Sequence, residues 1–127
     1  MEGYNKNKIS LVIMTAFYLF AGINHFRDPE FYLPLIPPYL PNPNLINDVS
    51  GIIEILLGFG LIFLTTRRFA AYGIIAMLIA FIPAHVHFIQ IDSCIEGGLC
   101  VPQWIGWARL LLIHPLLIWW AWSNSST

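Results

Sequence analysis

Charged side chains are scarce in this sequence: Asp, Glu, Lys and Arg make up 10% of the 127 residues, whereas 57% are hydrophobic. A soluble domain carries about 25% charged residues, because its surface faces water. A chain this apolar would expose large hydrophobic patches in water, so we expect the lipid bilayer to be its solvent. The net charge is −1 and no segment forms a basic patch, which argues against a nucleic-acid partner.

The motifs of the common cofactor and nucleophile sites are also missing. The sequence has no phosphate-binding Gly-rich loop, no Gly-x-Ser-x-Gly, no His-Glu-x-x-His and no haem motif. No metal site is expected either, because His85 and His87 are two residues apart and would point about 200° apart on a helix. The cofactor is therefore unknown at this level, and whether the chain is an enzyme stays open.

Four long apolar runs are present instead. Each is close to the ~20 residues that cross about 30 Å of hydrocarbon. They predict helices over residues 9–26, 45–64, 69–91 and 101–122. The runs lack the strict alternation of transmembrane strands. The sequence therefore predicts an all-α integral membrane four-helix bundle that forms a single domain over residues 1–127. The first run follows basic residues as a signal peptide would, but it is long and no small-residue cleavage site follows, so we expect a retained helix.

The three connections differ in character. The first, residues 27–44, is rich in proline and aromatic residues, so it cannot form a continuous helix. It is too apolar for a free loop, and we expect it at the membrane interface or folded over the mouth of the bundle. The second connection is predicted to be tight, Thr65–Arg68, and the third covers residues 92–103.

Lysine and arginine near the ends of the runs predict the orientation. The N-terminal segment and the second connection carry two each, the first connection carries Arg27, and the third connection and the C-terminus carry none. We therefore expect a multi-pass protein of the cell (inner) membrane with both termini in the cytoplasm and the Pro-rich first connection outside. Three tryptophans would then form a girdle at the inner interface: Trp119, Trp120 and Trp122.

The two cysteines, Cys94 and Cys100, would lie on the outer side, where disulfides form. Gly97 and Gly98 between them let the chain double back, so a structural disulfide is the expected state. A redox-active pair is the alternative, although catalytic pairs usually have the Cys-x-x-Cys spacing at a helix N-terminus.

Polar and ionisable residues gather in the outer half of the predicted bundle. The candidates for ligand binding or proton exchange are Asn24, His25, Glu54, His85, His87, Arg109 and His114. A charge at the bilayer centre costs about 2.5–3.5 kcal/mol, so Glu54 and Arg109 are expected to pair inside the bundle. Small residues flank the acid on one face of its helix, at Gly51 and Gly58, and leave room for a close helix or a cavity. Pro83 and Pro115 each remove a backbone donor, so kinks are expected beside the cluster.

Six short motifs follow one another along nearly the whole chain. They are Ala21-Gly22-Ile23-Asn24-His25-Phe26, Pro29-x-Phe31-Tyr32, Ile36-Pro37-Pro38-Tyr39-Leu40-Pro41, Ser50-Gly51-x-x-Glu54-x-x-x-Gly58, Thr66-Arg67-Arg68-x-Ala70-Ala71 and Phe81-x-Pro83-Ala84-His85. With Arg109 and Pro115, they resemble the DoxX-like family of small four-helix membrane proteins, and they are distantly similar to NACHO, an assembly chaperone for acetylcholine receptors. The resemblance implies the four-helix fold and a core motif that contains Glu54 and His25. The Cys94–Cys100 connection has no counterpart in the general pattern.

The family name derives from a subunit of a thiosulfate:quinone oxidoreductase, so the resemblance implies a membrane partner of redox enzymes. With the polar cluster, it predicts a pocket that binds a small or lipid-like ligand of the quinone type, or a membrane subunit of a redox system. Glu54 would exchange a proton, and Arg109 would hold a carbonyl or anionic oxygen. A structural pair that fixes helix register is the alternative reading of the two residues. For the chain, the alternatives are a non-enzymatic assembly factor, with a membrane-protein partner or as a homo-oligomer, and a membrane isomerase acting on a sterol- or isoprenoid-like substrate.

Overall fold

The computed structural model describes residues 2–126, and the side chains of that part from Asn7 onward. The regular structure of this part is all helical and contains no strand, which confirms the predicted all-α class. Four helical segments are long and apolar enough to cross a membrane: Asn7–Arg27, Pro43–Ile62, Leu64–Gln90 and Gln103–Asn124. The side chain of Lys6, which enters the predicted orientation, lies outside the described part.

Residues 2–126 form nine helical elements. The first segment is α1 (Glu2–Arg27), and the first connection contains a short α2 (Pro29–Tyr32) and the 3-10 turn η1 (Leu33–Leu35). The second segment is α3 (Pro43–Ile62). The third consists of α4 (Leu64–Ala80) and α5 (Ile82–Gln90), and the fourth of α6 (Gln103–Ala108), the π-helical turn η2 (Arg109–Ile113) and α7 (His114–Asn124).

The connection between α3 and α4 is shorter than predicted. Only Phe63 separates the two helices, with extended backbone angles (φ −94°, ψ 130°), so residues 65–68 form the first turn of α4 and not a loop. Their side chains satisfy the carbonyls at the end of α3, which have no donor within that helix. The hydroxyl of Thr66 donates to the carbonyl of Gly60 at 2.7 Å, and Arg67 Nε donates to that of Leu61 at 2.9 Å.

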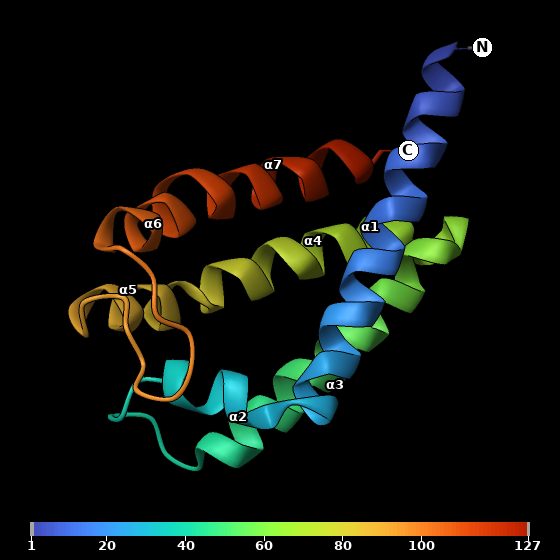
Figure 1. Ribbon diagram of the computed structural model, residues 1–127. Coiled ribbons are helices and arrows are strands. Elements are labelled where there is room, and N and C mark those ends of the chain that lie inside the picture. The colour runs from blue at the N-terminus through green and yellow to red at the C-terminus, as the bar shows by residue number, and fades with distance from the viewer. Residues whose placement is uncertain (1, 127) are drawn as a thin grey trace.

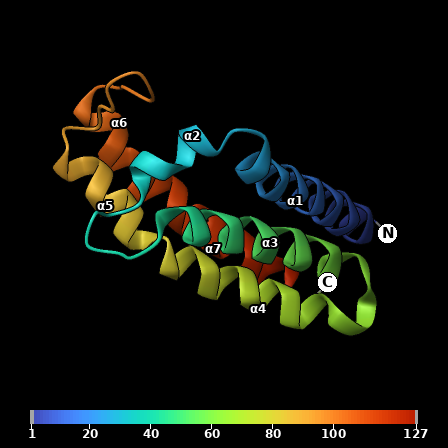
Figure 2. The same ribbon diagram turned by 90° about the horizontal axis from the view of Figure 1, so that it is seen from below.

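The helices pack as two inclined pairs. Helix α3 lies between α1 and α4 (Figure 2), and α7 packs against α4. The α1–α3 pair is inclined to the α4–α7 pair, so the two pairs meet near the chain ends and separate toward α5 and α6 (Figure 1). Both termini and the α3–α4 connection lie at one end of the bundle, whereas the Pro-rich connection and the third connection lie at the other.

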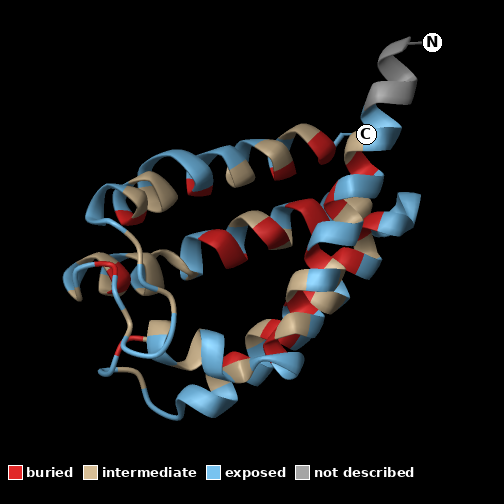
Figure 3. Cartoon of the chain, in the orientation of Figure 1, coloured by how far each residue is buried: buried red, intermediate tan, exposed pale blue. Residues whose placement is uncertain are grey.

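The apolar core occupies the end where the pairs meet. Buried residues face inward along α3 and α4, and the outer sides of all long helices are exposed (Figure 3). The indole of Trp120 also turns inward here and donates from Nε1 to the hydroxyl of Ser10 at 2.8 Å. Trp120 is half-buried, whereas Trp119 and Trp122 are exposed, and the girdle of the three at the inner interface stays a prediction.

Both predicted helix distortions are present. Because Pro83 has no N–H for the carbonyl of Ile79, α4 ends at Ala80 and α5 begins two residues later. Near Pro115 the distortion is a π-helical turn, in which the N–H of His114 donates to the carbonyl of Arg109, five residues back. Arg109 and His114 thus lie at the two ends of the turn.

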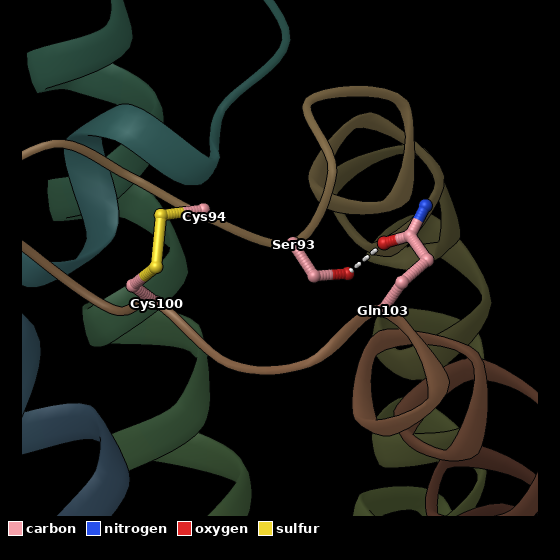
Figure 4. The surroundings of a disulfide bond; sticks show 4 residues. All are labelled: Ser93, Cys94, Cys100 and Gln103. Carbon is pink, nitrogen blue, oxygen red and sulfur yellow. Dashed lines mark hydrogen bonds between the residues drawn. A yellow bond between two sulfur atoms is a disulfide. The ribbon is translucent and has the colours of Figure 1, made fainter.

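The third connection is closed by the predicted disulfide between Cys94 and Cys100 (Figure 4). Next to it, the buried hydroxyl of Ser93 donates to Gln103 Oε1 at 2.6 Å, and Gln103 Nε2 donates to the carbonyl of Ile89 at 2.9 Å. These bonds connect the end of α5 to the start of α6, so they fix the chain that leads to Arg109.

Candidate functional site

The site begins at a close approach of α1 and α3. A Cβ at Gly51 would lie 2.8 Å from the Cβ of His25 and 3.0 Å from the carbonyl oxygen of Gly22. The two helices therefore touch through their backbones at this level. The predicted face of α3 is confirmed as buried at Gly51, Glu54 and Gly58, and the approach brings it against the His25 side of α1.

His25 is held in one orientation by Asn47. The Nδ1 atom of His25 lies 2.7 Å from Asn47 Oδ1, and Asn47 Nδ2 donates to the backbone carbonyl of His25 at 2.9 Å. That carbonyl can only accept, so the amide of Asn47 is fixed and its oxygen faces the ring. The ring nitrogen Nδ1 must therefore carry the proton of the hydrogen bond.

The other nitrogen of the ring faces Glu54. His25 Nε2 lies 3.6 Å from Glu54 Oε1, and both side chains are buried. Because Nδ1 is already protonated, a further proton at this contact can lie on Nε2, which makes an imidazolium–carboxylate pair, or on Glu54, which makes a neutral pair.

Tyr32 and Asn24 connect the first connection to this pair. The ring of Tyr32 stacks on the ring of His25 with 3.8 Å between centroids, and its hydroxyl accepts from Asn24 Nδ2 at 2.8 Å. Burial raises the pKa of Tyr32, so its phenol keeps the proton at neutral pH. Asn24 therefore acts on the cluster through Tyr32, and it lines neither of the cavities described below.

The expected ion pair between Glu54 and Arg109 does not form. The guanidinium of Arg109 lies over the ring of Phe88, 4.8 Å from its centroid, and the partner of Glu54 is His25. The reason is the backbone contact of α1 with α3, which places His25 next to the acid, whereas Arg109 reaches the cluster from the other helix pair.

Three histidines lie in the third and fourth segments, and two of them belong to the site. The rings of His85 and His114 meet edge to face with 4.6 Å between their centroids. His114 Nε2 donates to the carbonyl of Leu78, beside the break in the third segment. His85 and His114 thus belong to the cluster, whereas His87 lines neither cavity. Within residues 2–126, no group of three or more His, Cys, Asp or Glu side chains is placed to hold a metal ion.

Two adjoining cavities lie where the helix pairs separate. The outer cavity, of about 340 Å³, is bounded by the first connection and by α3, α5 and η2. The inner cavity, of about 240 Å³, extends between α1, α4 and α7. Four residues line both cavities: Glu54, Phe81, His85 and Arg109.

Three buried polar atoms around the inner cavity have no hydrogen-bond partner within the described part of the chain: Tyr18 Oη, Glu54 Oε2 and Arg109 Nη1. All three residues line the inner cavity. Buried polar groups are nearly always paired, since leaving one unpaired costs about 1–3 kcal/mol. Three such atoms, from α1, α3 and η2, could together bond a polar group placed in this cavity.

Sequence reasoning missed Tyr18 and Asn47 as members of the site. Each lies seven residues, or two helical turns, before a predicted member of its own helix: Tyr18 before His25, and Asn47 before Glu54. This spacing was the available signal. Phe88 likewise follows His85 by three residues, about one turn of α5. Tyr32 carried no such signal, because its place depends on how the first connection packs.

Comparison with known proteins identifies a family but no activity. The chain belongs to the family described as a domain of unknown function (DUF8561), whose model matches residues 14–125. No curated protein and no solved structure matches the chain.

Proposed function

We propose that this member of the family is an integral protein of the cell (inner) membrane that binds a lipid-like ligand of the quinone type inside its helix bundle. Both termini would lie in the cytoplasm, so the site would occupy the outer half of the bilayer. The ligand would present a carbonyl or hydroxyl oxygen to Glu54, Arg109 and Tyr18, with His25 sharing the proton of Glu54. The chain would then serve as a membrane subunit of a redox system.

The surface of the helices supports the placement in a membrane. The outward faces of all four segments carry large exposed apolar side chains, as at Val12, Leu56, Ile79 and Leu111. Exposed tryptophans lie at both ends of the fourth segment: Trp104, Trp107, Trp119 and Trp122. Aromatic residues at both ends of an apolar span are typical of the two membrane interfaces.

The three unpaired atoms of the inner cavity are the observation that carries the ligand proposal. Arg109 Nη1 is a donor, Tyr18 Oη can donate or accept, and Glu54 Oε2 accepts when the carboxyl is ionised. A carbonyl oxygen would accept from Arg109 and Tyr18, and a hydroxyl would also donate to Glu54. The ligand thus needs an oxygen-bearing head, and an apolar body fits the apolar walls around it.

The pair of His25 and Glu54, next to the ligand, would allow the site to exchange a proton. When a carbonyl occupies the site, the shared proton can move to Glu54 and be donated. When a hydroxyl occupies it, Glu54 can accept a hydrogen bond while the proton stays on His25 Nε2. His25 and Glu54 would therefore let one site hold both the oxidised and the reduced form of a quinone-type ligand.

The test uses the protein purified in detergent and a benzoquinone with a decyl tail as the probe. Glu54→Gln keeps the size of the side chain but removes the charge, and a hydrogen bond to a buried charge contributes about 1.5–3 kcal/mol. We expect Glu54→Gln to weaken probe binding at least tenfold without loss of folded protein. The matched control is Glu30→Gln, at an exposed acid of α2 outside both cavities. Equal binding by wild type and Glu54→Gln would refute the proposal.

We also propose that the family is related to the DoxX-like proteins. The order of the six motifs along the chain supports this relationship. An experimental DoxX-like structure in which the acid of the second helix faces a histidine of the first would agree with it. A structure in which that acid faces lipid would contradict it.

A further inference from the structure

We propose that the two cavities hold two parts of one ligand, a single-chain amphiphile whose oxygen-bearing head occupies the inner cavity and whose apolar chain lies in the outer one. This inference rests on the proposed function and deepens it, because it specifies how the ligand lies and which class of lipid fits. The wall that the cavities share, at Glu54, Phe81, His85 and Arg109, is the point at which head and chain would join.

The inner cavity is the one whose lining includes all three residues with an unpaired polar atom. Its walls carry Tyr18, Glu54 and Arg109, each with an atom that lacks a partner, and the edge of the His85–His114 pair. A head with one or two oxygens would satisfy these atoms. A bare hydrocarbon placed here would leave them buried and unpaired, which buried polar groups rarely are.

Apart from the shared wall, the polar residues of the outer cavity are mostly paired within the protein. His25 is bonded to Asn47 and faces Glu54, and Tyr32 is bonded to Asn24. The rest of its lining is dominated by apolar side chains of the first connection, including Leu35, Ile36, Pro37 and Leu40. Because few unpaired polar groups lie beyond the shared wall, the part of this compartment away from that wall suits a hydrocarbon chain.

The sizes favour one chain and a small head. Ligand pockets usually measure about 300–1,000 Å³, and the outer cavity of about 340 Å³ is at the low end of that range. The inner cavity of about 240 Å³ is smaller still. A prenyl or alkyl tail on a single ring fits these volumes better than a two-chain phospholipid with a large head.

Cavity-filling substitutions separate the two compartments. Ala21 lines only the inner cavity and Ala84 lines only the outer one. The probes are a benzoquinone with a decyl tail and the same ring with a methyl group in place of the tail. Their affinities are compared at equal probe concentration within the detergent micelles. The control is Ile52→Phe, at an exposed residue of α3 that lines neither cavity.

We expect Ala21→Phe to weaken the binding of both probes at least tenfold. Ala84→Phe should lower the affinity for the decyl probe to that for the methyl probe, and it should leave the methyl probe within twofold of wild type. Ile52→Phe should leave the affinity for both probes unchanged. If Ala84→Phe fails to fold, Ala84→Leu fills part of the same space. It should give the same pattern with smaller changes in affinity.

Two results would overturn this placement. If Ala84→Phe weakened both probes equally, or Ala21→Phe weakened neither, head and chain would not occupy separate compartments. Failure of the proposed function itself has another signature, since Glu54→Gln would then bind both probes as wild type does.

Discussion

The amide of Asn47 bonds His25 at two points, with its oxygen facing ring atom Nδ1 and its nitrogen bonded to the backbone carbonyl. The two residues lie on different helices, so the contact fixes both the packing of α1 on α3 and the protonation of the ring. It leaves Nε2 as the only nitrogen of His25 that can exchange a proton with Glu54. One buried amide thus links helix packing to the chemistry of the site.

Removal of this amide should destabilise the fold. Asn47→Ala leaves Nδ1–H and a backbone carbonyl buried without partners, and each unpaired group costs about 1–3 kcal/mol. We expect a clearly lower Tm for the purified protein than for wild type. Asn44→Ala, at an exposed position one turn earlier in α3, is the matched control and should unfold as wild type does. Equal Tm values for the two variants would contradict the role given to Asn47.

The backbone contact of α1 and α3 predicts a difference between two glycines. A Cβ at Gly51 would meet the Cβ of His25 and the carbonyl of Gly22, neither of which can move without its helix. A Cβ at Gly73 would meet only the end of the Leu57 side chain, which can rotate. Replacement of either glycine by Ala stabilises its helix by about 1 kcal/mol. Overpacking lowers the free energy of unfolding by about 1–3 kcal/mol, and it applies mainly at Gly51.

We therefore expect Gly51→Ala to lower Tm and Gly73→Ala to leave it near the wild-type value. Thermal unfolding followed by circular dichroism measures both. A Gly51→Ala protein as stable as Gly73→Ala would show that the helices can separate at this level without cost.

The disulfide should stabilise the end of the bundle that leads to Arg109. A closed loop of this size contributes about 2 kcal/mol in the chain-entropy model. Combined replacement, Cys94→Ser with Cys100→Ser, should lower Tm and speed hydrogen exchange over residues 89–103, where Ser93 and Gln103 join α5 to α6. Both effects should appear in wild type on addition of a reductant. The double variant itself should not respond to the reductant, and a response there would assign the effect to another group.

Two neighbouring tryptophans should differ in their contact with lipid. Trp119 is exposed, whereas Trp120 packs inward and donates to Ser10. In vesicles that contain brominated lipid, a variant that keeps only Trp119 should lose more fluorescence than one that keeps only Trp120. Equal quenching would contradict the inward position of Trp120, and no quenching of either would contradict insertion of the fourth segment.

The helical segments could be predicted from hydropathy and the distortions from proline, because both signals are local. The α3–α4 connection was misplaced because its polar residues resemble a loop, whereas Thr66 and Arg67 serve as partners for the last carbonyls of α3. The acid and the imidazole of the site could also be predicted, since ionisable groups stand out in apolar runs. Their partners could not. Whether Glu54 meets Arg109 or His25 depends on which helices touch, and that is decided by the backbone contact at Gly22 and Gly51.

Mass spectrometry of the lipids extracted from purified wild type, Glu54→Gln and Glu30→Gln tests the ligand site most directly. We expect a single-chain amphiphile with an oxygen-bearing head to be enriched in wild type and in Glu30→Gln, and to be depleted in Glu54→Gln. Three identical extracts that match the bulk membrane lipids would contradict a ligand site at Glu54.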